Sequence, residues 1–197
     1  MKNTLDFYKD IYDPLFKKRY TKTSNRGKPA LRKFREFMKK NDVEIKNMID
    51  VGCAWGKTLE YWENKKVKAY GVDVSKETVA YCQKKKFRCY LASATDLSIF
   101  KDNKFDLYMA TDVYEHLRTE DLDYAMKEAI RITKKYLVIR PHPVLDKRKT
   151  LHLTVWELSK WEDFFKKYNL NIIPIGDNGE IVYKNVFLME VRRNIDG

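Results

Sequence analysis

The chain has 197 residues, 44% of them apolar, which is enough for one domain with a sizeable core. No apolar run of about 18 residues is present, and the first residues lack the apolar stretch of a secretory signal, so we expect a cytoplasmic protein without a membrane span. The net charge is +12, so the chain is strongly basic. The three cysteines form no CxxC pair and no metal-finger spacing, which favours reduced thiols.

Basic charge is concentrated in residues 14–41, which hold eleven Lys or Arg and one acidic residue. Such a block attracts phosphate, so a nucleic-acid partner is one expectation for this segment. A solvated basic face without a partner is the alternative, and the sequence leaves both open.

The first 42 residues predict a basic and aromatic helical cap. Aromatic residues between Phe7 and Tyr20 recur at helix-compatible spacings, and Pro29 suits the first turn of a second helix that runs to about Lys40. We expect this cap, residues 1–42, to pack on a core of residues 43–197 as part of one structural domain.

In the core, predicted strands and helices alternate. Strands are predicted at 47–51, 67–73, 87–91, 104–110, 136–140, 171–175 and 183–192, and helices at 57–65, 76–86, 119–132 and 160–168. The last two strands leave no room for a helix between them, so they predict an antiparallel hairpin at the sheet edge. The fold class is therefore α/β, with a doubly wound, mostly parallel seven-stranded sheet.

A glycine turn follows the first predicted strand, which ends in Asp50 and leads into Gly52-Cys53-Ala54-Trp55-Gly56. A strand, a glycine turn and a helix let the backbone approach a nucleotide-like ligand closely. The second strand ends in Asp73, where a carboxylate can accept hydrogen bonds from ribose hydroxyls. Ala54 and Lys57 occupy the second and third glycine positions of a dinucleotide turn, which disfavours a nicotinamide-dependent oxidoreductase.

Together, these motifs resemble the class I S-adenosylmethionine-dependent methyltransferases over about residues 45–192. The resemblance implies S-adenosylmethionine as the cofactor, with its methionine portion against the glycine turn, its ribose at Asp73 and its adenine near Val74. Relatives often carry an acidic residue where this chain has Ser93, so either backbone groups at Ala94 or the side chain of Asp96, three residues after Ser93, are expected at the adenine. The implied cofactor residues follow the first four strands and are Asp50, Gly52, Cys53, Ala54, Gly56, Asp73, Val74, Ala94, Asp96 and Thr111.

The candidate catalytic residues follow the fourth and fifth strands. Relatives often carry an EHL or EHI tripeptide after the fourth strand, matched here by Glu115-His116-Leu117. Methyl transfer needs an aligned nucleophile and, for some acceptors, a base, which a histidine can provide. Arg140 suits an acidic or phosphate group of the acceptor, or an ion pair with Asp112 or Glu115. The candidates are Asp112, Glu115, His116, Arg140, His142 and His152.

A metal-binding alternative concerns part of this set. Asp112-x-x-Glu115-His116, with His152 later, is similar to the E-x-x-E-H set of small-RNA 3′-terminal 2′-O-methyltransferases, where a divalent ion holds ribose hydroxyls. Asp112 replaces the first glutamate, and the gap to the last histidine is shorter. Because the Glu-His pair is widespread among metal-free relatives, the main expectation is a site without metal.

The sequence thus predicts a methyltransferase that acts on oxygen or nitrogen, most plainly of a small molecule. The alternatives are an RNA- or nucleotide-directed enzyme, for example a ribose 2′-O-methyltransferase, and a non-catalytic subunit of this fold that binds nucleic acid. Enzymes that methylate amino groups of DNA or glutamine carry an Asn/Asp-Pro-Pro-aromatic tetrapeptide after the fourth strand. This chain has TDVY there instead, which disfavours those two acceptor classes.

Overall fold

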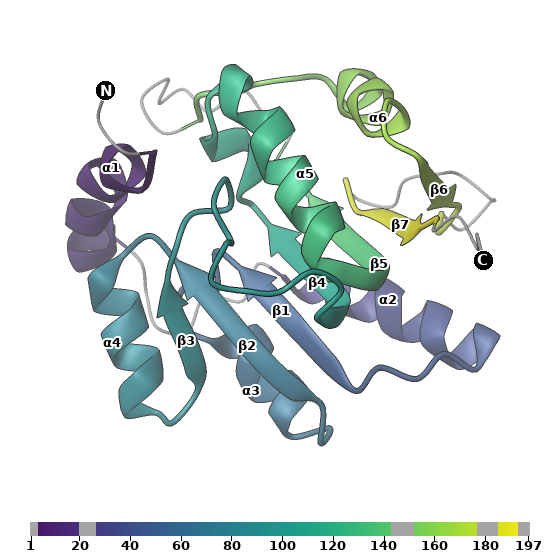
Figure 1. Ribbon diagram of the computed structural model, residues 1–197, viewed down its shortest axis with the longest axis horizontal. Helices are drawn as coiled ribbons and strands as arrows, with labels where there is room; N and C mark the ends of the chain where they lie inside the picture. Colours follow the sequence, from purple (N-terminus) through teal and green to yellow (C-terminus); the bar gives the residue numbers. More distant parts are fainter. Residues whose placement is uncertain (1–3, 20–26, 143–151, 177–184, 193–197) are drawn as a thin grey trace.

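The computed structural model describes residues 4–19, 27–142, 152–176 and 185–192 (Figure 1). Its centre is a seven-stranded sheet in the order β3-β2-β1-β4-β5-β7-β6. The strands are Asn47–Val51 (β1), Lys68–Asp73 (β2), Arg88–Leu91 (β3), Phe105–Thr111 (β4), Thr133–Arg140 (β5), Leu170–Ile173 (β6) and Phe187–Val191 (β7). β1 to β5 are parallel, so the doubly wound α/β fold expected from the sequence is confirmed.

Helices cover both faces of the sheet, as Figure 1 shows. They are Thr4–Arg19 (α1), Lys28–Asn41 (α2), Lys57–Glu63 (α3), Lys76–Lys84 (α4), Leu122–Ile132 (α5) and Leu158–Lys166 (α6), with 3-10 turns at Tyr114–His116 (η1) and Thr119–Asp121 (η2). The predicted helix 119–132 therefore starts as a 3-10 turn and becomes α-helical at Leu122. Among the described residues, none of these helices has the length and apolarity to cross a bilayer.

The core has two layers because the strands alternate side chains between the two faces of the sheet. On one face, Ile49 and Tyr108 pack with residues of α5 and α6; on the other, Met48 and Leu107 pack with residues of α2, α3 and α4. All four of these strand residues are fully buried. A strand covered on both faces reads as a continuous apolar run, which is why β1 and β4 were predictable from the sequence.

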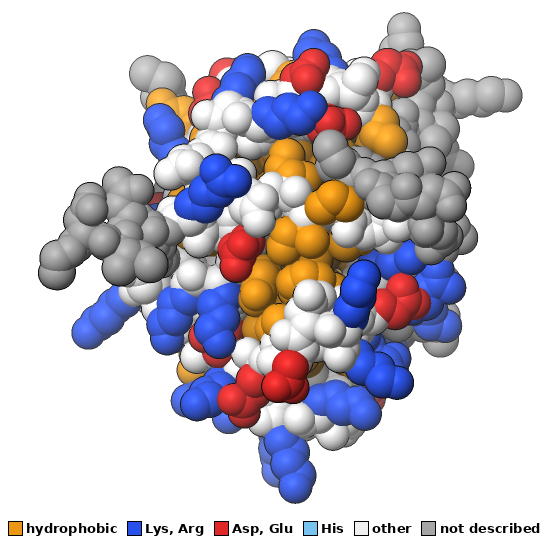
Figure 2. Space-filling model, turned by 90° about the vertical axis from the view of Figure 1, so that its right-hand side faces the viewer, with side chains coloured by type: hydrophobic (Ala, Val, Ile, Leu, Met, Phe, Trp, Pro, Cys, Tyr) orange, Lys and Arg blue, Asp and Glu red, His pale blue; other side chains and the backbone are white. Residues whose placement is uncertain are grey.

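The antiparallel C-terminal hairpin expected at the edge of the sheet is confirmed. β7 lies between β5 and β6 and is antiparallel to both, so β6 forms the edge of the sheet. Figure 2 faces this side of the molecule and shows a strip of apolar side chains bordered by Lys and Arg side chains. The predicted strand 183–192 is observed as Phe187–Val191, and residues 183 and 184 lie outside the described part.

The two N-terminal helices pack in different places. α1 contacts α4, and the Asp13 carboxylate accepts a hydrogen bond from the Lys76 backbone N–H at 3.1 Å. α2 instead packs on a face of the sheet, where the Phe34 ring contacts Trp62 of α3 and Tyr136 of β5. The division at residue 42 stays a prediction. At the carboxyl edge of the sheet, Tyr8 and Tyr12 of α1 line a pocket together with Gly27, which directly precedes α2.

Candidate active site

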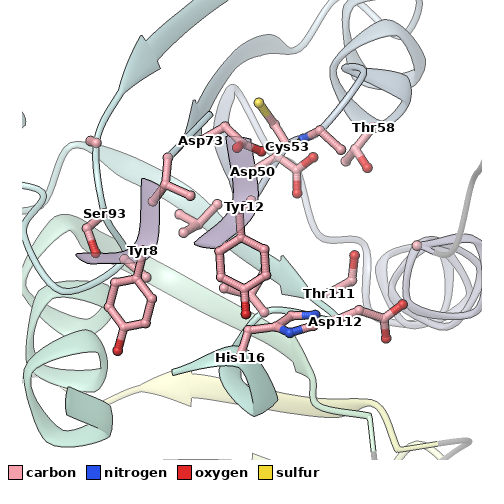
Figure 3. A pocket seen from close by; sticks show the side chains of 18 of the residues that line it. Tyr8, Tyr12, Asp50, Cys53, Thr58, Asp73, Ser93, Thr111, Asp112 and His116 are labelled. Carbon is pink, nitrogen blue, oxygen red and sulfur yellow. Dashed lines mark hydrogen bonds between the residues drawn. The ribbon is translucent and has the colours of Figure 1, made fainter. Parts of the chain in front are cut away.

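A pocket opens at the carboxyl ends of β1, β2 and β4 (Figure 3), the edge where parallel α/β sheets bind ligands. Its volume is about 150 Å³, roughly ten times what one water molecule requires, so it can admit part of an organic ligand. α1 closes one side with Tyr8 and Tyr12. Of the residues proposed for the cofactor, those that line the pocket are Asp50, Gly52, Cys53, Ala54, Asp73, Val74, Ala94 and Thr111.

The glycine turn is held in left-handed backbone conformations. Gly52 has φ +73°, and a Cβ there would lie 2.4 Å from Val113 Cγ2, so a larger residue does not fit. Gly56 has φ +71° and stands directly before α3. Ala54 also has a positive φ, +45°, which costs an L-residue about 1–2 kcal/mol. The alanine thus adopts a conformation that glycine would take without strain.

Asp73 holds the turn in place. Its carboxylate accepts hydrogen bonds from the backbone N–H groups of Ala54 and Ser75, both at 2.9 Å. Burial raises the pKa of Asp73 to about 6, although these two N–H groups oppose the rise. A carboxylate has about four acceptor positions, so Asp73 keeps acceptor capacity beyond its two backbone bonds. The same residue therefore fixes the turn and lines the pocket.

Asp50 lies deeper in the same pocket and is 4% exposed. Burial raises its pKa to about 8; a hydrogen bond from Thr58 lowers it, and the nearby Asp73 charge adds to the rise. Near neutral pH, Asp50 therefore carries a proton in much of the population. A cationic ligand in this pocket would favour its ionised form.

The structure does not bring Asp96 to the pocket. Its side chain is exposed and accepts a hydrogen bond from the Ser98 backbone N–H at 3.1 Å. Ser93 and Ala94 line the pocket instead, and the Ser93 hydroxyl is 2.8 Å from that of Thr95. The acid of this loop thus stabilises the loop itself, and backbone and hydroxyl groups face the pocket at this end.

At the other end of the pocket, Asp112 and Arg140 form an ion pair. The carboxylate Oδ1 lies 2.5 Å from Arg140 Nη1, and the Asp112 N–H donates to the Arg140 carbonyl at 2.8 Å. Thr111 pairs with Arg140 across β4 and β5. Because Asp112 directly follows Thr111, this pairing places the side chains of Asp112 and Arg140 side by side. The ion pair expected as one role for Arg140 is therefore present. Asp112 has φ +56° and lines the pocket, whereas Arg140 does not.

The three histidines gather beside Asp112. The ring centroids of His116 and His152 are 4.9 Å apart, and those of His142 and His152 are 5.5 Å apart. His116 lines the pocket, and its ring contacts Tyr12 of α1 at 5.2 Å. The Thr154 N–H donates to the Glu115 carbonyl at 3.0 Å, which fixes the segment of His152 against η1.

Glu115 is fully buried below these rings. Neither of its carboxylate oxygens has a hydrogen-bond partner among the described residues, and the same holds for Nδ1 of His152. Burial raises the pKa of Glu115 to about 8, and the nearby Asp112 charge adds to the rise. The backbone N–H groups of Glu115 and His142, which lie near the carboxylate without forming a hydrogen bond of ordinary geometry, oppose the rise, as does Arg140. Ligand atoms of Glu115, His116 and His152 lie within 4.8 Å of one another, so three members of the proposed metal set come together.

Sequence reasoning did not place α1 at the pocket. Tyr8 and Tyr12 are four residues apart and so share one helix face, which was the available signal. The Tyr8 hydroxyl hydrogen-bonds with Asp121 and accepts from the Arg118 N–H at 2.9 Å. Trp55, left without a role by the sequence, lines the pocket and packs edge-on against Tyr81, with ring centroids 5.0 Å apart.

Comparisons with known proteins bear on the family and the fold of this chain. Residues 49–139 match a family model described as a methyltransferase domain. A search of curated proteins found no match. A structure of a Pyrococcus horikoshii protein is 16% identical with a TM-score of 0.65 and covers 92% of this chain and 98% of its own.

Two further solved structures share the fold. A SAM-dependent methyltransferase from Archaeoglobus fulgidus is 16% identical with a TM-score of 0.65, over 91% of this chain and 99% of its own. Magnesium protoporphyrin IX methyltransferase from Synechocystis, solved with bound SAM, is 13% identical with a TM-score of 0.64, over 98% and 99%. The family model, which spans 91 of the 197 residues, and the fold that these structures share support a class I S-adenosylmethionine-dependent methyltransferase.

Proposed function

We propose that this methyltransferase acts on an oxygen or nitrogen of a small acceptor held beside Asp112 and His116. The observation that carries the proposal is the enclosure of that end of the pocket. Tyr12 of α1 packs against the His116 ring, and Tyr8 is fixed to Asp121, so α1 covers the space next to the candidate base. An acceptor that fits under a helix is compact, which favours a small molecule over a polymer.

The pocket residues fit S-adenosylmethionine. Asp73 retains acceptor capacity for ribose hydroxyls, and the turn has glycine where Val113 leaves no room for a side chain. Asp50 offers a carboxylate to the cationic methionine portion, and Val74 and Ala94 line the end proposed for adenine. When bound, the cofactor supplies an electrophilic methyl group on a sulfonium sulfur.

The chain's own residues orient the acceptor and accept its proton. We assign His116 as the base, because it lines the pocket and histidine is the commonest general base in enzymes. Asp112, fixed by Arg140, positions the acceptor rather than taking its proton, because its ion pair stabilises the charged carboxylate. His142 and His152 pack behind His116 and orient its ring.

A labelling experiment tests the acceptor class. The protein would be incubated with methyl-labelled S-adenosylmethionine and with separate metabolite, RNA and protein fractions. We expect label in the metabolite fraction, and label confined to RNA would overturn the small-molecule proposal. His116→Gln should lose at least about a hundredfold in rate, in the range typical for general bases, and keep its cofactor affinity by calorimetry. Asp96→Asn, outside the pocket, is the matched control and should behave as the unaltered protein.

A second candidate function rests on the buried carboxylate of Glu115. Both of its oxygens lack hydrogen bonds, and an isolated buried carboxylate is costly unless it is protonated or binds a cation. Glu115, His116 and His152 present the oxygen and imidazole ligands that suit Mn²⁺, Fe²⁺, Co²⁺ or Zn²⁺. Asp112 is the member of the proposed metal set that pairs with Arg140 instead. Such an ion would lower the pKa of acceptor hydroxyls and stabilise the alkoxide, which favours ribose 2′-O-methylation.

Metal content separates the two candidates. Titration of the purified protein with Mn²⁺, Co²⁺ and Zn²⁺ would be followed by calorimetry, with Glu115→Gln as the variant and Asp96→Asn as the control. Stoichiometric binding that Glu115→Gln abolishes, together with methylation of an RNA 3′ end that periodate oxidation prevents, would support the metal-assisted enzyme. Absence of binding would leave the metal-free acceptor site.

A further inference from the structure

The three cysteines are separated in the sequence and match no metal-finger or redox motif, yet their side chains meet behind the glycine turn. Cys53 belongs to the turn, Cys82 to α4 and Cys89 to β3, and all three are buried. Their sulfur atoms lie within 4.8 Å of one another, and the Sγ atoms of Cys53 and Cys89 are 3.3 Å apart. This cluster has no part in the proposed methyl transfer, although Cys53 lines the cofactor pocket.

Gly71 makes the closest pair of thiols possible. It lies on β2, between Asp50 of β1 and Cys89 of β3 in the sheet register. A Cβ at Gly71 would lie 2.8 Å from Cys53 Sγ, so only the missing side chain leaves room for this thiol above the strand. The side chain of Cys53 therefore passes over β2 at Gly71, and its sulfur reaches Cys89 on β3.

Cys53 links the pair to the cofactor pocket. Cys53 belongs to the turn that lines that pocket, whereas Cys82 and Cys89 do not line it, and none of the three is more than 4% exposed. Its sulfur packs against Gly71 and points away from Tyr12 and His116 (Figure 3), so an oxidant reaches it only when the turn moves. A bound cofactor would hold the turn in place, which makes the reactivity of Cys53 depend on cofactor occupancy.

We propose that Cys53 is an oxidation site of the cofactor-free protein, with Cys89 as the thiol that closes a disulfide. The oxidant is a hydroperoxide. Cys53 gives its proton to a solvent water and its sulfur attacks the peroxide; the O–O bond breaks, a sulfenic acid forms, and the hydroxide that leaves takes a proton from solvent and becomes water. The Cys89 sulfur then attacks the Cys53 sulfur, an S–S bond forms, and the hydroxyl leaves with the Cys89 proton as a second water. Two thiols are oxidised, and one peroxide is reduced.

Cys82 stays outside the disulfide. Its Sγ donates a hydrogen bond to the Ala54 carbonyl at 3.3 Å. Hydrogen bonding with Cys82 and Cys89, together with burial, raises the pKa of the Cys53 thiol, whereas the thiols of Cys53 and Cys89 lower the pKa of Cys82, so Cys82 is a poor acceptor for the Cys53 proton. The 3.3 Å separation of the Cys53 and Cys89 sulfur atoms therefore selects that pair.

Disulfide formation would disturb the turn that binds the cofactor. The S–S bond is about 2.05 Å long, whereas the two sulfur atoms now lie 3.3 Å apart. Cys53 must move toward β3, although its N–H is bonded to the Val72 carbonyl at 3.0 Å and the next residue to Asp73. We expect the oxidised protein to bind S-adenosylmethionine at least about tenfold more weakly; this consequence rests on the proposed function.

Mass spectrometry tests the pair directly, because trypsin places each cysteine on its own peptide, residues 47–57, 77–84 and 89–101. The full chain would be treated with hydrogen peroxide, with and without S-adenosylmethionine, then alkylated and digested without reduction. We expect a linked peptide 47–57/89–101 that dithiothreitol removes and that the cofactor suppresses. Cys53→Ser and Cys89→Ser should abolish it, while Cys82→Ser should still form it.

Three results would overturn the proposal: no linked peptide, linkage of Cys53 to Cys82, or equal linkage with and without a cofactor that binds. Circular dichroism of each variant ensures that the linkage is measured on folded protein. Calorimetry on the reduced protein separates this proposal from the proposed function. If the reduced chain fails to bind S-adenosylmethionine, the function is wrong, yet the linked peptide still decides whether Cys53 and Cys89 form an oxidisable pair.

Discussion

Asp73 combines two tasks in one carboxylate, since it fixes the glycine turn and lines the pocket. Asp73→Asn replaces an acceptor by an amide whose N–H₂ faces the N–H of Ala54 or Ser75. We expect at least about a tenfold loss in S-adenosylmethionine affinity and a loss of stability of about 1–3 kcal/mol, measured by calorimetry and urea unfolding. Asp96→Asn, with its exposed local hydrogen bond, should change neither quantity. Equal effects of the two substitutions would contradict the role of Asp73.

Asp50 makes cofactor binding depend on pH. Its pKa of about 8 means that many molecules bind a proton there at pH 7, and a cationic ligand must release it. We expect affinity to rise with pH up to about 8, and the binding heat to differ between phosphate and Tris buffers. Asp50→Asn should remove that difference. Identical heats in both buffers for the unaltered protein would contradict the assignment.

The same pKa has a consequence for stability. Because the folded protein holds this proton more tightly than the unfolded chain, stability falls as the pH rises from the unfolded carboxyl pKa through about 8. We therefore expect Asp50→Asn to unfold at higher urea than the unaltered protein at pH 9, with a smaller difference at pH 5. The reverse ordering would show that Asp50 is ionised without cost in the fold.

At the scale of elements, α1 is held over the pocket by few contacts. The Tyr8 hydroxyl bonds with Asp121 and with the Arg118 N–H, and the Arg118 guanidinium lies over the Phe7 ring at 4.6 Å. Tyr8→Phe leaves the buried Asp121 and the Arg118 N–H without that partner, which costs about 1–3 kcal/mol. Relative to the unaltered protein, we expect Tyr8→Phe to speed up amide hydrogen exchange more in residues 4–19 than in α5. Unchanged exchange in α1 would mean that other contacts hold the helix.

The basic helix α2 allows a test of the nucleic-acid partner. Arg35 and Lys39 line a groove with Lys46, which precedes β1, and thus lie toward the amino ends of the strands, away from the pocket. We propose that any nucleic acid held there is not the methyl acceptor. Changing Arg35 and Lys39 to Gln should weaken RNA binding and flatten its salt dependence by about one unit of slope per lost contact, without changing cofactor affinity. No RNA binding at low salt would exclude this partner for α2.

At the scale of the whole molecule, local patterns predicted the parallel half of the fold well. The apolar runs of β1, β2 and β4 and the acids at the ends of β1 and β2 are each properties of a few neighbouring residues. The place of β7 was not predictable in this way, because its pairing with β5 joins residues about fifty positions apart, such as Leu137 and Met189. A strand's sequence indicates that it is buried, but not which neighbour it pairs with.

The site shows the same limit. The residues of the turn and Asp73 were predicted because they follow their strands directly. Tyr12 and the thiol pair were missed because they depend on contacts between distant segments, α1 with η1 and the turn with β3. Asp96 looked suitable by position alone, and its local bond to Ser98, which decides its direction, became visible only in the fold.

The position of β7 bears on how the protein folds during synthesis. Because Phe187 and Met189 are fully buried between β5 and β6, the sheet closes only after residues 187–191 have left the ribosome. Until then, the free side of β5 exposes backbone groups and apolar side chains, a state prone to association with other chains. The cofactor pocket, built from β1 to β4, is complete in sequence much earlier. Its ligand is thus available to stabilise the nascent half before the last strand docks.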